Sequence, residues 1–171
     1  GAPTAPAQVA CGGKIPPRVQ HPTFSKPPTT KVDPDKTYLA TLQTSCGGVT
    51  IRLDPKKAPE TTANFMFLAG RHFYDSTWFH RIVPGFVFQG GDPLGTGNGG
   101  PGYQVVEAPP KTLKYVKYVV AMAKAADDPV GASGSQFFVV TGKDGEQLTP
   151  DYALLGKVTS GQDVADKIGA I

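Results

Sequence analysis

Apolar and polar residues alternate along several short segments of the chain after residue 37. Apolar side chains recur at every second position from Tyr38 to Leu42 and again from Val49 to Leu53. A period of two residues is typical of a β-strand with one buried face. Gly47-Gly48 separates the two segments and suits a turn, so the pattern predicts a β-hairpin over residues 38–53.

Helical signals occur at two further places in the chain. Pro59 and Glu60 suit the first turn of a helix that we expect to continue over residues 61–69. Residues 161–168 predict a second, shorter helix. The other apolar runs predict strands over 77–83, 86–90, 118–122, 136–140 and 153–158, with a long loop rich in Gly and Pro over 91–110.

Strands therefore dominate, and two helices accompany them. An open sheet with many strands would leave unpaired edges, and closure into a barrel removes them. We expect a mainly β fold, in which an antiparallel sheet closes into a barrel and the two helices cap it.

The composition divides the chain at about residue 37. Residues 1–36 are rich in Pro, Ala, Thr and Lys, and the pairs Pro16-Pro17 and Pro27-Pro28 resist helix and sheet. We interpret residues 1–36 as a linker or as an extended arm laid on the domain. Residues 37–171 are interpreted as one domain, because a 171-residue chain with 39% hydrophobic residues suffices for a single core.

Several classes of protein fit the sequence poorly. A net charge of +3 is too small to indicate nucleic-acid binding. No apolar run approaches the ~20 residues of a membrane span, and the three histidines are too widely spaced to favour a zinc site. The glycine-rich run 95–102 lacks the preceding strand and following helix of a nucleotide-binding loop, so it predicts a surface loop. We expect neither a metal nor another cofactor.

The chain contains two cysteines, Cys11 and Cys46. They could form one disulfide, or they could remain as two buried thiols. The spacing alone does not decide between these alternatives, because a bridge depends on the separation of the two Cα atoms.

Three segments carry the most specific pattern. Residues 79–92 read FHRIVPGFVFQGGD, residues 95–103 read GTGNGGPGY, and residues 134–138 read GSQFF. In this order they resemble the cyclophilin family, and the resemblance extends from about Thr37 to the end of the chain. The form of the second segment resembles bacterial members, and the Pro-rich arm with Cys11 resembles membrane-tethered, extracytoplasmic actinobacterial members.

The resemblance implies both a fold and an activity. The resemblance implies an eight-stranded antiparallel barrel with two helices, and we expect its last strand to be missing from this sequence, which stops just after the second predicted helix. The implied activity is that of a peptidyl-prolyl cis-trans isomerase, which accelerates rotation of X-Pro peptide bonds and so assists protein folding. The implied partners are unfolded or flexible proline-containing polypeptides.

Physical chemistry identifies a suitable catalyst among these residues. Rotation about a peptide bond has a barrier of ~18–20 kcal/mol, because the nitrogen lone pair is delocalised into the carbonyl group. A fixed cation with N–H donors favours the twisted state, and Arg81 supplies a planar, permanently charged group. The resemblance implies that five residues form the catalytic set: Arg81, Phe86, Gln89, Gln136 and Phe138.

The resemblance also implies a set of residues that bind the substrate. In the family the matching positions wall the proline ring or pair with the peptide main chain. The implied substrate-binding residues are Val87, Met122, Ala123, Lys124, Gln147, Leu148 and Tyr152.

Three of these positions depart from the common family pattern. Gln147 stands where relatives often carry a tryptophan that contributes to cyclosporin binding, so we expect weakened affinity for cyclosporin. Tyr152 replaces a frequent histidine, and Lys124 replaces a frequent asparagine. The leading interpretation is an active isomerase. The alternative is a proline-peptide binding module or holdase with little catalysis.

The last expectation concerns the compartment. A Pro-rich arm suits a semi-rigid spacer, and disulfides persist mainly in oxidising compartments. We therefore expect an extracytoplasmic domain, tethered through an N-terminal membrane anchor missing from this sequence, with Cys11 bonded to Cys46; the alternative is a cytoplasmic protein. A bond between these cysteines would close a loop of about 35 residues.

Overall fold

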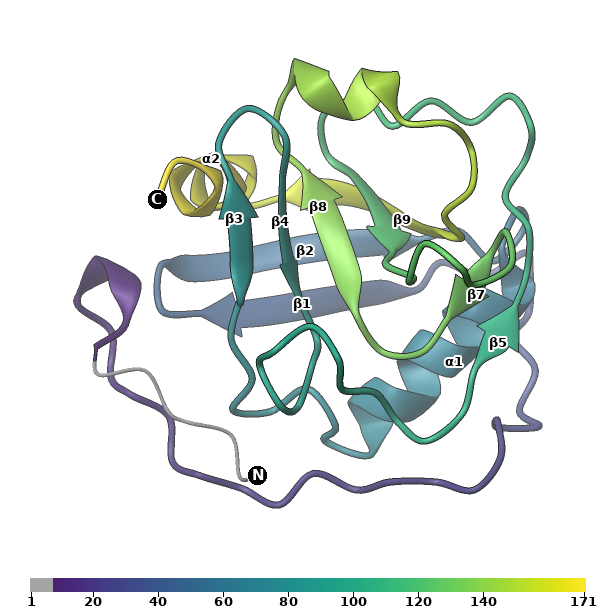
Figure 1. Ribbon diagram of the computed structural model, residues 1–171, viewed down its shortest axis with the longest axis horizontal. Helices are drawn as coiled ribbons and strands as arrows, with labels where there is room; N and C mark the ends of the chain where they lie inside the picture. The colour runs from purple at the N-terminus through teal and green to yellow at the C-terminus, as the bar shows by residue number, and fades with distance from the viewer. Residues whose placement is uncertain (1–7) are drawn as a thin grey trace.

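The computed structural model describes residues 8–171, so the first seven residues of the predicted arm lie outside the described residues. Its centre is a seven-stranded sheet with the strand order β1-β2-β9-β6-β8-β4-β3 (Figure 1). The strands of this sheet are β1 (Leu39–Thr44), β2 (Gly47–Leu53), β3 (Arg81–Val83), β4 (Val87–Gly90), β6 (Val119–Met122), β8 (Phe137–Val140) and β9 (Leu154–Ser160). A separate two-stranded sheet pairs β5 (Val105–Val106) with β7 (Ala132–Ser133).

Every pair of neighbouring strands in the large sheet is antiparallel. The sheet curls, so that β1 and β2 cross behind β3, β4 and β8 in the view of Figure 1. Strands β1 and β3 end the sheet, and no ladder within residues 8–171 joins them. The expected mainly β architecture is confirmed, but the sheet forms a half-barrel rather than a barrel closed by backbone pairing.

Two α-helices accompany the sheet, as expected: α1 (Pro59–Gly70) and α2 (Gln162–Gly169). Pro59 lies in the first turn of α1, where its missing N–H would have had no helical partner. The carboxylate of Glu107 accepts the backbone N–H groups of Glu60 and Thr61 at 2.9 and 3.0 Å. This distant side chain therefore caps the helix, since Ala58 at its N-terminal boundary offers no side-chain acceptor.

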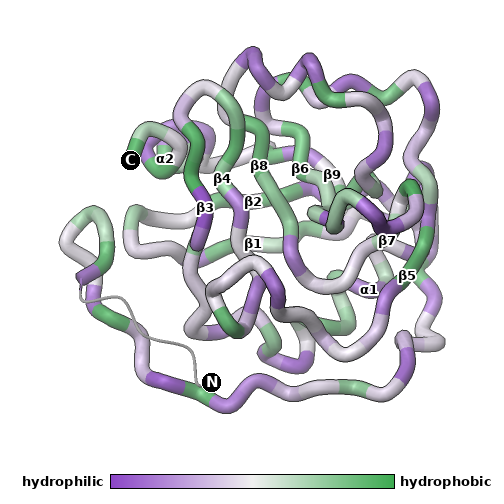
Figure 2. Tube along the Cα trace, viewed as in Figure 1, coloured by the Kyte–Doolittle hydropathy of each residue, from purple (hydrophilic) through white to green (hydrophobic). Residues whose placement is uncertain are grey.

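The large sheet separates two apolar clusters. Phe88 and Val139 belong to the main core, together with Phe65 of α1 and Ile168 of α2. The intervening residues of the same strands point to the other face and form a second cluster that includes Val87, Phe138 and Val140. Figure 2 shows hydrophobic colour along the central strands β6 and β8. The period-two prediction for these strands is confirmed.

Two predictions of secondary structure were wrong in their extent. The strand expected over 77–83 begins only at Arg81, since the β3–β4 ladder ends at the Arg81–Gln89 pair. Thr77 instead closes a turn, in which its N–H donates to the carbonyl of Tyr74 at 3.3 Å. The loop expected over 91–110 contains β5, and the N–H of the next residue, Glu107, also donates to Gly131 at 2.9 Å.

The described part of the arm runs along the outside of the domain (Figure 1). The N–H of Phe24 donates to the carbonyl of Pro101 at 2.8 Å, and the Phe24 ring lies 5.0 Å from the ring of Phe67 on α1. Near its start the arm forms a short 3-10 helix, η1 (Ala10–Gly12), and Cys11 forms the expected disulfide with Cys46 across a Cα separation of 5.1 Å. The arm is therefore attached covalently at one end and by packing further along.

Candidate active site

A small pocket of about 120 Å³ lies against the second apolar cluster. Most of the residues predicted for the site converge here from β3, β4, β8 and the loops around them. The lining consists of Arg81, Phe86, Val87, Gln89, Ala123, Lys124, Phe138, Leu148 and Tyr152. Of the predicted site residues, only Gln136, Met122 and Gln147 lie outside this lining.

Met122 lies on the wrong side of the sheet for a direct role. It pairs with Phe137 in the β6–β8 ladder, and both side chains belong to the main core. The preceding pair, Ala121 and Phe138, belongs to the second cluster below the pocket. Met122 is fully buried, so its side chain supports the sheet from the inside rather than contacting a ligand in the pocket.

Strand pairing sets the position of Arg81. Arg81 lies opposite Gln89 in the β3–β4 ladder, and Gln89 lies opposite Phe138 in the β4–β8 ladder. The guanidinium carbon of Arg81 is 5.7 Å from the centre of the Phe86 ring. Arg81 takes part in none of the salt bridges found within residues 8–171, so no carboxylate there neutralises its charge.

Aromatic rings form the apolar wall of the pocket. The ring of Tyr152 stands edge-on to Phe138, with centroids 5.4 Å apart. Behind them, the hydroxyl of fully buried Tyr115 donates to the carbonyl of Tyr152 at 2.7 Å and accepts the Tyr152 N–H at 3.0 Å. Burial raises the pKa of Tyr115 to about 12. Tyr115 therefore fixes the backbone of the wall, a role that its place in the sequence did not reveal.

The two glutamines of the predicted catalytic set are bonded to each other. The side-chain nitrogen of Gln89 donates to the side-chain oxygen of Gln136 at 3.0 Å. The nitrogen of Gln136 donates in turn to the carbonyls of Gly97 and Gly99, both at 2.9 Å. Gln136 thus borders the pocket through Gln89 rather than lining it.

Lys124 is a second cation at the pocket. Its ammonium nitrogen lies 5.5 Å from the centre of the Tyr152 ring and 3.4 Å from the carbonyls of Ala125 and Asp128. The N–H of Ala123 donates to the carbonyl of Gln136 at 2.9 Å, so this part of the main chain is tied to the end of β8. Arg81 and Lys124 are the charged residues of the lining, and both are positive.

Two polar groups near the loop that follows β4 contribute to the site, and the sequence did not identify them in this role. Asp92 is 1% exposed. Burial would raise the pKa of its carboxyl group, but hydrogen bonds from the backbone of Leu94, Gly99, Gly97 and Thr96 lower it overall. An acidic residue at the start of a glycine-rich run is the sequence signal for such a loop anchor, because carboxylates readily accept nearby backbone N–H groups.

The second missed group is His80, which neighbours Arg81. Both ring nitrogens of His80 are buried and lack a hydrogen-bond partner within the described residues. Burial lowers the pKa of His80; the negative charge of Asp92 opposes this shift, and the positive charge of Arg81 adds to it. His80 is therefore held neutral beside the cation.

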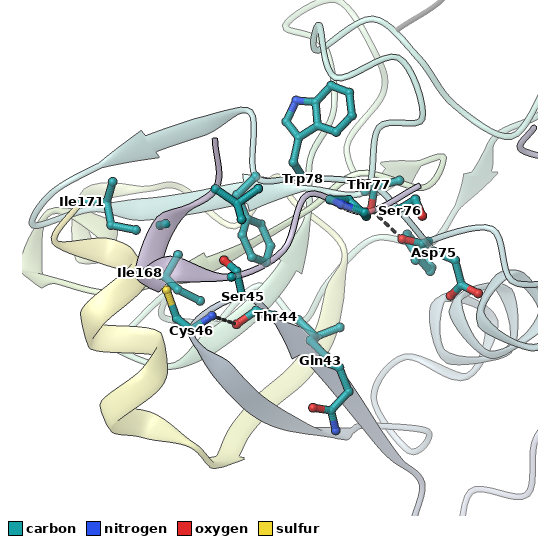
Figure 3. A pocket seen from close by; sticks show the side chains of 18 of the residues that line it. Gln43, Thr44, Ser45, Cys46, Asp75, Ser76, Thr77, Trp78, Ile168 and Ile171 are labelled. Carbon is teal, nitrogen blue, oxygen red and sulfur yellow. Dashed lines mark hydrogen bonds between the residues drawn. The ribbon is translucent and has the colours of Figure 1, made fainter. Parts of the chain in front are cut away.

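A larger hollow of about 830 Å³ lies elsewhere, between the start of the arm, the β1–β2 hairpin and the C-terminal end of α2. Figure 3 shows Ile168 and Ile171 on one side of it and Ser76 and Thr77 on the other. Its charged lining residues are Lys14 and Asp75, and Asp75 is already within 3.1 Å of the ring of His72. We place the candidate active site in the smaller pocket, because there two cations and the amide of Gln89 converge on an aromatic wall.

Within residues 8–171, no group of three or more His, Cys, Asp or Glu side chains is placed to hold a metal ion. The small pocket presents a guanidinium group, an ammonium group, a side-chain amide and aromatic rings.

The sequence and the fold both match known proteins. The family described as "Cyclophilin type peptidyl-prolyl cis-trans isomerase/CLD" matches residues 39–171. A peptidyl-prolyl cis-trans isomerase of Helicobacter pylori is 40% identical over 136 residues, covering 78% of this chain and 81% of the relative. Peptidyl-prolyl cis-trans isomerase B of Streptomyces anulatus is 40% identical over 149 residues, covering 77% and 83% of the two chains.

Solved structures resemble the fold as well. A cyclophilin-type isomerase of Cryptosporidium parvum, crystallised in the presence of the dipeptide Ala-Pro, superposes with a TM-score of 0.69 at 32% sequence identity. The match covers 77% of this chain and 85% of the other.

Proposed function

Because the chain belongs to the cyclophilin-type peptidyl-prolyl cis-trans isomerases, we propose that it isomerises X-Pro bonds at the small pocket beneath Arg81. The observation that carries the assignment is the convergence of Arg81 and Gln89 on the aromatic wall formed by Phe86 and Phe138. We further propose that residues 37–171 form the catalytic domain and residues 1–36 its arm; the family match over residues 39–171 supports this division.

The reaction requires rotation without bond cleavage. Uncatalysed X-Pro exchange takes about tens to hundreds of seconds, and a typical enzyme turns over roughly 10–10³ times per second. The difference corresponds to a barrier lowered by about 3–7 kcal/mol. No nucleophile is needed, so preorganised charge and a shaped apolar pocket are sufficient.

Arg81 is the group that favours the twisted state. As the peptide bond twists, the nitrogen lone pair becomes localised and can accept a hydrogen bond. The guanidinium group of Arg81 offers permanent charge and several N–H donors on a planar frame. Its position over the Phe86 ring, with no acidic partner in the described chain, leaves these donors available to the substrate.

The apolar part of the pocket receives the proline ring. Val87 and Phe138 are almost completely buried at its base, and Leu148 and Tyr152 border it. Gln89 uses one side-chain N–H for Gln136, so its other N–H and its carbonyl oxygen remain to bind the substrate main chain. Ala123 and Lys124 also line the pocket, where their main chain is available to the same peptide.

The substrates are exposed X-Pro bonds of unfolded or flexible polypeptides. The presence of an Ala-Pro dipeptide with the Cryptosporidium relative supports a proline-containing ligand. An NMR exchange measurement on a short X-Pro peptide tests the function. We expect exchange to accelerate in proportion to protein concentration, and rates equal to the uncatalysed ones would refute the proposal.

A proline-peptide binding module is the second candidate function. It is favoured by the unusual residues Lys124 and Tyr152 in the pocket and Gln147 beside it. Binding measured on the same peptide separates the two functions, since a module binds without accelerating exchange. We also propose that Gln147 weakens cyclosporin binding, because an amide supplies less apolar contact area than an indole ring.

We further propose that the domain works outside the cytoplasm, tethered by its arm. The disulfide between Cys11 and Cys46 supports an oxidising compartment. Among the described residues, no helix has the length and apolar character required to cross a bilayer. Fractionation of cells with an antibody against the domain tests the compartment, and recovery only in the soluble cytoplasmic fraction would contradict the proposal.

A further inference from the structure

Asp92 anchors the loop that follows β4. Its carboxylate accepts the backbone N–H of Leu94 at 2.8 Å, of Thr96 at 3.0 Å and of Gly97 at 2.6 Å. The backbone carbonyl of Asp92 also accepts the N–H of Gly95 at 3.1 Å. One buried side chain therefore organises the whole turn.

The backbone of this turn lies close against the carboxylate of Asp92. A Cβ atom added to Gly99 would lie 1.9 Å from a carboxylate oxygen of Asp92, so only a glycine allows the approach. Gly95 and Gly97 have φ angles of +68° and +94°, a region that side chains disfavour. The glycines thus let the backbone close around Asp92.

This loop presents two carbonyl groups to Gln136. The nitrogen of Gln136 has two N–H groups, and it donates to the carbonyls of Gly97 and Gly99. The orientation of the Gln136 amide is thereby fixed, because a flipped amide would place its oxygen against two carbonyl oxygens. Its oxygen must then face Gln89, from which it accepts a hydrogen bond at 3.0 Å.

We propose that Asp92 is a positioning residue for the isomerisation, acting through its loop and Gln136 to fix the side-chain amide of Gln89 beside Arg81. The inference rests on the proposed role of Gln89 in substrate binding. Gln89 lies opposite Arg81 in the β3–β4 ladder, so the orientation of its amide decides whether an oxygen or an N–H group faces the substrate.

The first test is Asp92→Asn, which keeps the shape of the side chain but removes its charge and replaces one accepting oxygen with an NH₂ group. We expect kcat/KM for a short X-Pro peptide to fall about 10-fold, measured well below the unfolding temperature. The side-chain NH₂ signals of Gln89 and Gln136 should shift and broaden in the ¹⁵N NMR spectrum. The matched control is Asp54→Asn, since Asp54 accepts the N–H of Lys57 at 3.0 Å in a turn that contributes nothing to the pocket.

The decisive measurement is a double-mutant cycle. In a Gln136→Ala background, Asp92→Asn should change kcat/KM by less than about 2-fold. The contacts that connect the Asp92 loop to Gln89 through Gln136 are already absent in that background. A full 10-fold loss in that background would overturn the inference, and so would full activity of Asp92→Asn alone. A wild-type protein that fails to accelerate exchange would instead refute the proposed function itself.

A second variant tests the same connection between the loop and Gln136 if Asp92→Asn does not fold. Gly97 is exposed, and an added Cβ would meet nothing closer than the His80 ring at 3.9 Å. Gly97→Ala therefore strains the loop backbone without a clash. We expect Gly97→Ala to lower kcat/KM in the wild-type background and to have little effect in the Gln136→Ala background. Additive effects of the two substitutions would overturn the proposal that Asp92 acts through Gln136.

Discussion

The guanidinium carbon of Arg81 lies 5.7 Å from the centre of the Phe86 ring, at the mouth of the small pocket. Within residues 8–171 the same kind of contact occurs once more, where the guanidinium of Arg71 lies 5.1 Å from the ring of Phe67. These two arginines share a local geometry but only Arg81 lines the pocket. Comparison of the two separates a catalytic contribution from a general stabilising one.

Arg81→Ala should lower kcat/KM by about 100-fold or more, because it removes charged donors that act in the twisted state. The midpoint of thermal unfolding should change little, since Arg81 is exposed and outside the salt bridges of the described chain. Arg81→Lys should retain part of the activity, because it keeps the charge but loses the planar set of donors. Arg71→Ala is the matched control and should leave kcat/KM unchanged; an equal loss in both variants would contradict the assignment.

Tyr115→Phe should lower the free energy of unfolding by about 1–3 kcal/mol. The change leaves the part-buried N–H and carbonyl of Tyr152 without the hydroxyl that now bonds both. Denaturant unfolding measures the effect. Tyr118→Phe removes a hydroxyl that bonds the exposed carboxylate of Asp166, and should change stability by less than about 0.5 kcal/mol. Equal effects in the two variants would refute this account of the wall.

Gln147→Trp should strengthen cyclosporin binding by roughly 10- to 100-fold, because a large aromatic side chain at an interface can contribute 1–3 kcal/mol. Gln147 is exposed at the end of the 3-10 helix η2 (Lys143–Gln147), directly before Leu148 in the pocket lining. Isothermal titration calorimetry measures the affinity. Glu146→Trp places the same ring one residue earlier and should have a smaller effect; unchanged affinity in Gln147→Trp would count against the proposal.

Removal of the disulfide in a Cys11→Ser/Cys46→Ser variant should lower stability by about 3–4 kcal/mol, as expected for a closed loop of 35 residues. The isomerase activity should not change, because neither cysteine lines the small pocket. A reducing agent should destabilise the wild type and have no effect on the variant. Two free thiols in the denatured, unreduced wild type would exclude the bond.

The stability of the fold should decline as the pH falls through about 6.5, in part through His80. Its pKa is lowered in the folded protein, mainly by burial, so the unfolded chain binds the proton first as the pH falls through about 6.5. Stability is thus greatest above that value and is lost on acidification. The charged groups that face His80 are Arg81, which disfavours protonation, and Asp92, which favours it.

The measurement is denaturant unfolding at a series of pH values. His80→Gln should flatten the decline, and His72→Gln serves as a control substitution at an exposed histidine outside the pocket. Identical slopes for the wild type and His80→Gln would show that His80 does not contribute. The carboxyl of Asp92, whose pKa is also lowered, should add a further loss only at much lower pH.

Local sequence patterns predicted the strands that carry the site, because their period of two separates Val87 from Phe88 and Phe137 from Phe138. The same rule, applied to the β6 strand, would have assigned Met122 to the core. The aromatic run before Arg81 has the composition of a strand, but residues 78–80 join no ladder in the described part of the chain. Pairing into a ladder depends on contacts between distant segments, which a single sequence does not display.

The supports of the site were also invisible in the sequence. Tyr115 reaches Tyr152 across 37 positions, and Gln136 reaches Gly99 across the same distance. The glycine-rich run 95–102 was expected to be a surface loop, and its exposed residues agree with that expectation. Its carbonyl contacts with Gln136 follow from the tertiary fold, which brings the ends of β4 and β8 together.

Pocket residues and core residues alternate along β4 and β8, so one set can be substituted while the other is kept. A library of substitutions at Val87, Phe138 and Leu148 can vary the shape of the pocket while the core residues between them stay unchanged. Point substitutions there can therefore alter the pocket without altering the residues of the main core. Insertion of a single residue within β8 would instead exchange the two sets, and the protein should lose fold and activity together.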